Sequence, residues 1–296
     1  MASKVLILNF HRISDEVSPA YPPIPVKVFE KILAFLSRNA IVIPMEEIDR
    51  KSHGKKPRVV ISFDDAFMDF YEYALPLLVK YQLPAHQSII TRCAQTGQPM
   101  WTQRLNKLVE AWFREGRQRE LSGLLRMDSV KTSNPGKMAL DLYRKLLPQY
   151  NREAWLEKLK NGLQNHYQDT PMMQWEQIRE CMQYGVTMGS HTHTHQNLTL
   201  LTGDAVDAEA GTSVNLLWKH TGVKPTALAF PNGQYNQQVL DRVQKHGFRY
   251  LLTVDGQSFM PNSNTSKGAL LVPRFNMFNT SWWKNHLKLH YYKRFR

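Results

Sequence analysis

Short apolar runs alternate with amphipathic stretches along most of the chain. The apolar runs have the length and composition of buried β-strands, and they lie at 5–10, 41–44, 58–63, 85–90, 186–190, 226–230, 249–254 and 269–275. Apolar residues at helical spacing predict helices between them, at 26–39, 66–81, 172–185, 203–222 and 236–247. About seven strands separated by helices indicate a parallel sheet, either open or closed into a barrel.

This alternation is interrupted between about 101 and 170, where the sequence is charged and helical and contains no convincing strand. We interpret this interval as a helical insertion within a single catalytic domain that spans 1–296, because α/β barrels often reach this length as one domain. Hydrophobic residues make up 42% of the chain, which is enough for a sizeable core and makes general disorder an unsuitable description.

The cysteine content and the absence of long apolar segments narrow the class of protein. The two cysteines, Cys93 and Cys181, exclude a disulfide framework and a cysteine-based zinc site, and they suit a reducing compartment. No secretory signal and no apolar stretch of about 18 to 20 residues is visible. The sequence therefore predicts a soluble, cytoplasmic protein.

The formal net charge of +13 favours anionic partners, such as phosphates, lipid head groups or acidic glycans. The basic excess is most visible in the C-terminal tail, 281–296, which has five Lys or Arg residues and no acidic one. Trp283, Leu287 and Tyr291 would share one helical face there. Two interpretations stay open. The tail is either a last helix that packs on the domain, or an anchor on an anionic membrane surface, such as the inner face of the membrane. Nucleic-acid binding is not expected, since no known binding module is recognisable.

Two adjacent aspartates, Asp64 and Asp65, directly follow the apolar run at 58–63. Adjacent carboxylates repel each other, and burying even one of them is costly without a compensating partner. One explanation is a strand end followed by a helix N-cap, a position that Asp favours. The other is a metal, which would neutralise one carboxylate and leave the second free to take a proton.

Alternating histidines favour the metal. His191, His193 and His195 follow the predicted strand at 186–190. All three face one side if the segment is extended, whereas His191 and His195 share a face if it is helical. Parallel strand ends converge at one edge of a sheet, so that imidazoles and carboxylates would meet there. Two histidines and one carboxylate leave coordination positions open, which is typical of a catalytic site.

With these motifs the sequence resembles the polysaccharide deacetylase family (carbohydrate esterase family 4, the NodB homology domain). SFDDAF at 62–67 is similar to the first family motif, SHTHTH at 190–195 to the second, and ALAFPNGQYN at 227–236 to the later Pro-x-Gly segment. NFHRI at 9–13 and MMQWEQI at 172–178 resemble segments of the branch that deacetylates exopolysaccharide.

The resemblance implies a distorted (β/α)7 barrel and a role for each motif residue. Asp65, His191 and His195 would hold a divalent metal, with Asp64 as the general base. His193 lies between the ligands and has no ligand role in the pattern. Zinc is the expected ion from the ligand types, although other divalent ions are compatible.

Three further assignments concern the surroundings of the reacting carbonyl. The resemblance implies that the loop at Pro231 and Asn232 supplies a backbone N–H to the developing oxyanion. Many members have an Arg before this Pro to orient the base; here it is absent, and Arg274 is the candidate substitute, or else a surface ion pair. The family's late Leu-x-His acid also has no clean match, so His11, after the first strand, is the candidate acid, or else a structural hydrogen bonder.

The sequence thus predicts a metal-dependent hydrolase that removes N-acetyl groups from an amino-sugar glycan or a lipid-linked glycan precursor. Within the same class, the alternative is hydrolysis of another acyl group, an O-acetyl ester or a different amide. In another class, the alternative is a catalytically idle barrel that binds glycans.

Overall fold

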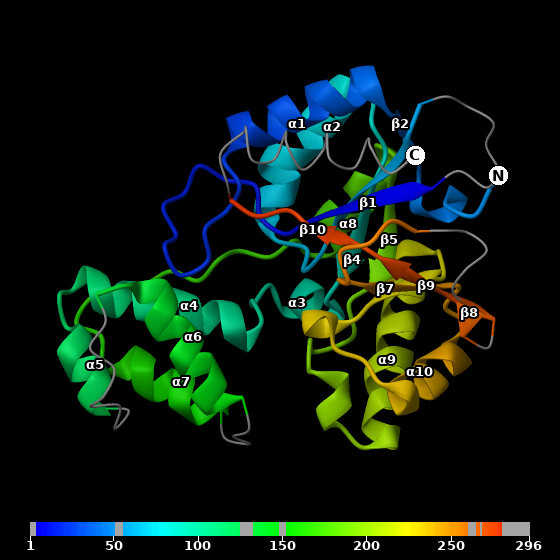
Figure 1. Ribbon diagram of the computed structural model, residues 1–296. Helices are drawn as coiled ribbons and strands as arrows, with labels where there is room; N and C mark the ends of the chain where they lie inside the picture. The colour runs from blue at the N-terminus through cyan, green and yellow to red at the C-terminus, as the bar shows by residue number, and fades with distance from the viewer. Residues whose placement is uncertain are drawn as a thin grey trace. The chain divides into compact units, whose positions relative to one another are not determined.

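The packing of the chain forms two compact units (Figure 1). The computed structural model describes residues 4–50, 56–124, 133–147, 152–259, 265–266 and 268–279. The first unit comprises Met1–Asp15, Ile24–Gly97 and Met172–Arg296, and the second comprises Glu16–Pro23 and Gln98–Pro171. The basic tail at 281–296 lies outside the described residues. That the chain works as one catalytic domain with an insertion stays a prediction.

The first unit is a nearly closed barrel of parallel strands. Around it, in order, are β1 (Val5–Phe10), β3 (Arg58–Phe63), β4 (Ala85–Ile89), β5 (Val186–Ser190), β6 (Ala227–Ala229), β7 (Tyr250–Thr253) and β9 (Ala269–Pro273). The short β2 (Ile41–Val42) also pairs in parallel with β3. The predicted parallel α/β barrel is therefore confirmed.

A bend in the last strand closes the barrel. β9 pairs in parallel with β7, whereas β10 (Phe275–Asn276) pairs in parallel with β1. Only Arg274 separates these two segments, so that one nearly continuous stretch connects the last strand to the first. β8 (Thr265–Ser266) adds an antiparallel neighbour to β9. The sequence prediction of one strand at 269–275 is thus modified by a break at Arg274.

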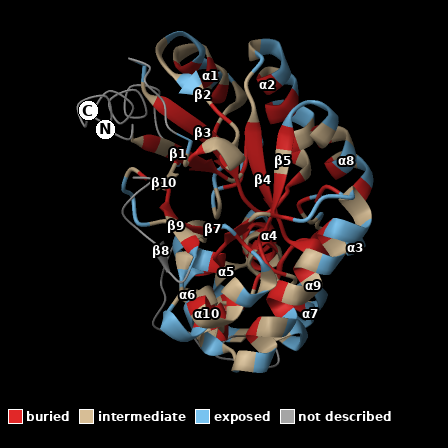
Figure 2. Cartoon of the chain, turned by 90° about the vertical axis from the view of Figure 1, so that its right-hand side faces the viewer, coloured by how far each residue is buried: buried red, intermediate tan, exposed pale blue. Residues whose placement is uncertain are grey.

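Helices follow the strands on the outside of the barrel. They are α1 (Val26–Asn39), η1 (Met45–Glu47), η2 (Phe70–Ala74), α2 (Leu75–Tyr81), α3 (Thr91–Thr96), α8 (Trp175–Gln183), η3 (Leu198–Leu200), α9 (Gly203–Thr221), η4 (Pro231–Gly233), α10 (Gln237–Val243) and η5 (Gln244–His246). The strands are mainly buried, apart from the short β2 and β10, whereas the helices expose their outer faces (Figure 2). α1 has the predicted bounds, and α3 was not predicted.

The helix expected from residue 66 begins only at Phe70, where η2 leads into α2. Asp65 and Ala66 have positive φ values of 78° and 66°, which no helix accommodates. The chain therefore turns sharply after Asp64 before the helix begins. This turn aims the two adjacent aspartates in different directions.

Alternation along the strands separates an inner from an outer set of side chains. The inner set includes an apolar cluster in which Val5, Ile7, Val60, Ala227, Ala229, Tyr250, Leu252 and Val272 pack together. Further along the same inward register, β1 presents Asn9, β3 presents Ser62 and then Asp64, and β9 is followed by Arg274. The carboxyl ends of the strands therefore enclose buried polar groups, and the rest of the barrel interior is filled by the apolar cluster.

Two outer clusters attach the helices to the barrel. α1 and α2 pack on the outer faces of β1 and β3, through Phe29, Leu33 and Leu78 against Leu8, Phe10, Ile61 and Phe63, and α8 extends the same cluster through Ile178 next to β5. α9 and α10 pack on β6 and β7, through Val206, Ala210, Leu240 and Val243 against Leu228 and Leu251. Both clusters follow from the amphipathic periodicity of the helices.

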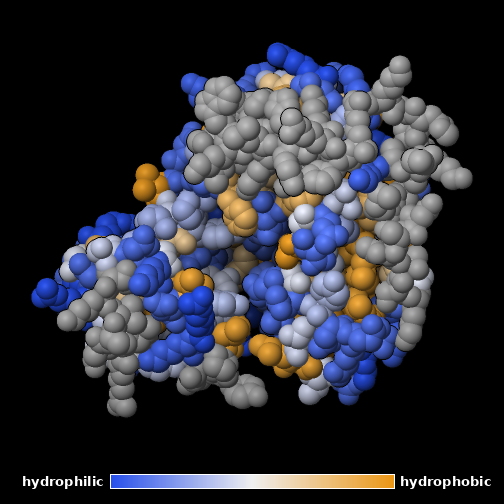
Figure 3. All heavy atoms as spheres, in the orientation of Figure 1, coloured by the Kyte–Doolittle hydropathy of each residue, from blue (hydrophilic) through white to orange (hydrophobic). Residues whose placement is uncertain are grey.

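The second unit is helical and has a core of its own. It contains α4 (Trp101–Arg114), α5 (Gln118–Leu124), α6 (Pro135–Leu146) and α7 (Arg152–Asn161). Leu108, Trp112, Leu142 and Leu156 are among its fully packed residues. Its outer surface is mainly hydrophilic (Figure 3), as expected of amphipathic helices that bury one face. Among the described residues, no helix has both the length and the apolar character that crossing a bilayer requires.

Gly189 on β5 gives a test of this packing. A Cβ at this position would lie 2.5 Å from Nε2 of the fully buried His86 and 3.1 Å from the carbonyl oxygen of Ala227. Gly189→Ala should therefore lower the free energy of unfolding by about 1–3 kcal/mol, the usual cost of overpacking. Urea denaturation followed by circular dichroism measures this change.

A double-mutant cycle identifies the cause. His86→Ala destabilises by leaving a cavity, but it also removes the clash, so the double variant should be less destabilised than the sum of the two single variants. Gly123→Ala in α5 is the control, since no atom lies within 4 Å of its added Cβ. Additivity within about 0.5 kcal/mol would contradict the predicted clash.

Candidate active site

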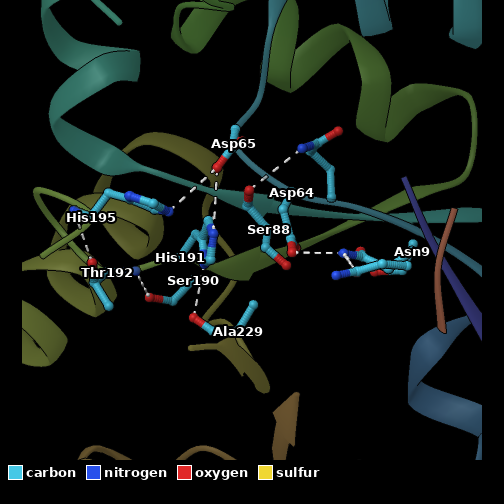
Figure 4. A network of polar contacts seen from close by, with 12 residues as sticks. Asn9, Asp64, Asp65, Ser88, Ser190, His191, Thr192, His195 and Ala229 are labelled. Carbon is cyan, nitrogen blue, oxygen red and sulfur yellow. Dashed lines mark hydrogen bonds and ion pairs between the residues drawn. The ribbon is translucent and has the colours of Figure 1, made fainter. Parts of the chain in front are cut away.

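The ends of β3 and β5 bring one carboxylate and two imidazoles together (Figure 4). The Oδ1 atom of Asp65 lies 3.4 Å from Nε2 of His191 and 3.7 Å from Nε2 of His195. One ligand atom from each residue lies within 4.8 Å of the others. All three residues are buried, so that the cluster is shielded from bulk water.

Left-handed backbone conformations shape both loops that carry these residues. Asp65 and Ala66 have positive φ after β3, and Thr192 (φ 66°) and His195 (φ 59°) have positive φ after β5. Such conformations cost a non-glycine residue roughly 1–3 kcal/mol each and persist only where the surroundings enforce them. Their concentration at these two strand ends is characteristic of a functional site.

Hydrogen bonding fixes the orientation of His191. Its Nδ1 lies 2.9 Å from the carbonyl oxygen of Ala229 on the neighbouring β6. A carbonyl only accepts hydrogen bonds, so Nδ1 carries a proton, and Nε2, which faces Asp65, is the nitrogen that would bind a metal. An outer hydrogen bond of this kind is what metal-ligating histidines usually make.

The donor set fits a divalent cation. Oδ1 of Asp65 is buried and has no hydrogen-bond partner in the part of the chain that the structure describes. Burial and the neighbouring His191 lower the pKa of His195 to about 4, so that its imidazole is neutral at pH 7. A carboxylate and two imidazoles facing one point are the ligands that zinc and related ions prefer.

His193 lies apart from this cluster. Its Nδ1 contacts the hydroxyl of Thr91 at 3.0 Å, at the start of α3. The ligand atoms of Asp65, His191 and His195 come together without it. Of the geometries left open by the alternating histidines, the structure shows the one in which the first and third converge.

Asp64 points the other way and pairs with Arg274. The guanidinium donates two hydrogen bonds of 2.8 Å, from Nη1 to Oδ1 and from Nη2 to Oδ2. Burial opposes ionisation of Asp64, but the charge of Arg274 and then that of His191 outweigh it and lower the pKa of the carboxyl. Asp64 is therefore ionised at neutral pH. Arg274 is fully buried, so the pair is not a surface ion pair.

Asn9 and Ser62 complete this arrangement, and neither had a role assigned from the sequence. Asn9 donates from Nδ2 to Asp64 (3.0 Å), while its Oδ1 accepts from Nη1 of Arg274 (2.8 Å). The hydroxyl of Ser62 donates to the same Oδ1 and also accepts from Arg274 (3.2 Å each). Polar residues in the inward register of otherwise apolar strands were the available signal.

The remaining predicted residues lie at the same end of the barrel. His11 directly follows β1 and is half-buried, and its charge contributes to lowering the pKa values of Asp64 and Asp65. Pro231 and Asn232 follow β6 in η4; Pro231 is buried, whereas Asn232 is exposed and has a φ of 57°. The roles of these three residues stay predictions.

Comparisons with known proteins agree with the motifs. The sequence model of the polysaccharide deacetylase family matches residues 148–251, which include His191 and His195. YxkH of Bacillus subtilis (strain 168), named as a polysaccharide deacetylase, is 23% identical over 258 residues. That alignment covers 86% of this chain and 65% of the Bacillus protein, so the chain spans slightly less than two thirds of this relative.

Solved structures of deacetylases share the fold. The deacetylase PplD of Streptococcus pyogenes superposes with a TM-score of 0.66 and 18% identity, covering 97% of this chain and 98% of its own. IcaB from Ammonifex degensii superposes with a TM-score of 0.61 and 15% identity, covering 97% of each chain. The family match, the Bacillus relative and this shared fold together confirm the resemblance to the polysaccharide deacetylase family that the motifs predicted.

Proposed function

We propose that this protein is a metal-dependent hydrolase that removes N-acetyl groups from an amino-sugar glycan or a lipid-linked glycan precursor. The observation that carries the proposal is the pair of buried carboxylates at the end of β3. Asp65 faces two imidazoles, whereas Asp64 is held by a buried arginine. This is the division between a metal ligand and a general base that hydrolysis of an acetamide requires.

The residues of the cluster are arranged to bind a cation. Asp65, His191 and His195 would hold the ion, with His191 fixed through Ala229. When bound, a divalent ion supplies Lewis acidity, which lowers the pKa of water and polarises a carbonyl. Zinc suits this donor set best.

Asp64 takes the proton from the attacking water in this proposal. Arg274 and Asn9 hold both of its oxygens, so the carboxylate is oriented as well as ionised. The same contacts lower its pKa, which weakens it as a base. We infer that orientation next to the reacting water offsets this loss, since positioning alone contributes several kcal/mol to catalysis.

Two further groups complete the reaction in this proposal. His11, at the end of β1, protonates the amine as it leaves. The backbone N–H at Asn232 donates to the oxyanion that develops on the acetamide oxygen, because Pro231 has no N–H to offer. Both assignments place the groups at the strand ends where the substrate must bind.

The buried constellation supports an active enzyme over an idle glycan-binding barrel. An isolated buried carboxylate is costly, and here Asp64 is buried together with its arginine and next to the second carboxylate. Hydrolysis of an O-acetyl ester would use the same residues, and substrate comparison separates it from the proposed amide hydrolysis.

The proposal is tested with a panel of N-acetylated and O-acetylated oligosaccharides, analysed by mass spectrometry. The wild-type protein should release acetyl groups from an N-acetylated member, whereas Asp64→Asn should be slower by about two to four orders of magnitude because it lacks the base. Release only from O-acetylated members would support the ester alternative. No release from any member, with metal bound, would contradict the proposal.

The metal assignment is tested by elemental analysis of purified variants. His191→Ala, His195→Ala and Asp65→Asn should each lose most of the bound divalent metal, because each removes a ligand or its charge. His193→Ala and Asp64→Asn should retain it. Depletion in His193→Ala equal to that in the other histidine variants would refute this ligand set.

Arg274 offers a third test. Arg274→Leu leaves the Asp64 charge buried without its partner, so it should lower the free energy of unfolding by about 3–5 kcal/mol. Arg274→Lys keeps a charge but loses the two-pronged contact, and it should fold, retain metal and have a lower kcat. Arg249→Ala, which removes the ion pair to Asp49 at the N-terminal end of β7, is the control and should change kcat little. An unchanged kcat in Arg274→Lys would argue against the orienting role.

A further inference from the structure

The loop that carries both candidate histidine ligands is held from two sides. We call residues 190–195 the ligand loop. From α3, the backbone N–H groups of Thr91 and Arg92 donate to the carbonyl oxygens of Thr192 (3.3 Å) and His193 (2.9 Å). These contacts satisfy loop carbonyls at the start of a helix, where free N–H groups are available.

From α9, one buried carboxylate accepts three hydrogen bonds from the loop. Oε2 of Glu209 accepts the backbone N–H groups of His193 (2.9 Å) and Thr194 (2.8 Å). Its Oε1 accepts the hydroxyl of Thr194. Only 7% of Glu209 is exposed. Hydrogen bonds to an ionised acceptor are about twice as strong as neutral ones, particularly where water is excluded.

One turn further along α9, Ser213 contacts the base of the loop. Its hydroxyl lies 2.6 Å from that of Ser190, which accepts the backbone N–H of Thr192 (3.1 Å). The hydroxyl of Thr192 in turn accepts the backbone N–H of His195 (3.1 Å). A connected series of hydrogen bonds therefore runs from α9 to the second histidine.

The contacts of Glu209 fall on His193 and Thr194, the two residues between the left-handed Thr192 and the left-handed His195. A loop free to relax would leave these unfavourable conformations and carry the imidazole of His195 away from Asp65. The carboxylate therefore opposes relaxation at the point where the backbone strain is concentrated.

We propose that Glu209 is a positioning residue, which fixes the ligand loop so that His195 faces Asp65 and a metal can bind; this inference rests on the proposed metal-dependent function. Glu209 touches neither the metal ligand atoms nor the substrate in this assignment. It acts through the two backbone N–H groups between the ligands. The function of the bond to the Thr194 hydroxyl is to keep the carboxylate in one rotamer.

The test measures zinc affinity by competition with a chromophoric chelator. Glu209→Ala should bind Zn²⁺ about 10–100-fold more weakly than the wild type, the usual effect of losing an outer contact of a metal site. Glu209→Gln keeps the shape and one acceptor oxygen, so it should recover most of the affinity. The matched control is Asp207→Ala on the same helix, whose carboxylate binds Arg242 and His246, and it should bind Zn²⁺ like the wild type.

A second readout separates positioning from stability. In Co²⁺-substituted protein, the visible absorption bands should change in Glu209→Ala but not in Asp207→Ala, whereas thermal melts of the metal-free proteins report any general destabilisation. If Glu209→Ala does not fold, Thr194→Val takes its place in the same Zn²⁺ competition assay. It removes the hydroxyl contact to Glu209 and should weaken Zn²⁺ binding about fivefold.

The outcomes distinguish failure of the positioning role of Glu209 from failure of the proposed metal-dependent function. Wild-type affinity and an unchanged Co²⁺ spectrum in Glu209→Ala, or in Thr194→Val where the former does not fold, overturn the positioning role and leave the proposed function standing. A wild-type protein that binds neither Zn²⁺ nor Co²⁺ overturns the proposed function and, with it, this inference.

Discussion

Two adjacent carboxylates are buried at the end of β3, and each needs its own compensating partner. Arg274 compensates Asp64 through a two-pronged contact, whereas Asp65 faces two imidazoles and keeps one oxygen without a hydrogen-bond partner among the described residues. An isolated buried carboxylate would be neutralised by protonation or would destabilise the fold. The sharp turn at Asp65 makes separate compensation possible, because it sends the two neighbouring side chains to different surroundings.

The barrel provides those surroundings through its closure. The last strand pairs first with β7 and then, past Arg274, with β1, so the guanidinium enters the barrel at the point of closure. There it contacts Asn9 of β1 and Asp64, which directly follows β3. Below this layer the interior is apolar, which excludes water and strengthens every charge-assisted contact above it. The fold and the candidate site therefore depend on the same pairing of the first and last strands.

The strained backbone of the ligand loop is maintained by hydrogen bonds to two neighbouring helices. Its carbonyl groups are bound by α3 and its N–H groups by Glu209, so that both polar sides of the backbone are satisfied. This accounts for two left-handed residues, Thr192 and His195, within four positions. The rigidity that results would favour one coordination geometry over others, which is what a metal ligand loop requires.

The sequence by itself determined the alternation of strands and helices, because apolar periodicity reflects which face of each element is buried. It also indicated Asp64, Asp65 and the outer two histidines. Paired carboxylates at a buried strand end repel each other unless a partner such as a metal compensates them, and spaced imidazoles can supply the remaining ligands. Helix bounds were recovered where periodicity continued to the end, as in α1, and missed before α2, where positive φ at Asp65 delays the helix.

Only the tertiary structure decided which groups compensate the carboxylates. Arg274 lies 210 residues from Asp64 in the chain, and the sequence left it open between a surface ion pair and an orienting role. Neither Asn9, although it begins the NFHRI segment, nor Glu209 had a role assigned from the sequence, because an inward-facing amide and a helix carboxylate look like many others until their partners are known. Compensation of a buried charge depends on distance and orientation in space, and these arise when the barrel closes and α9 packs beside the ligand loop.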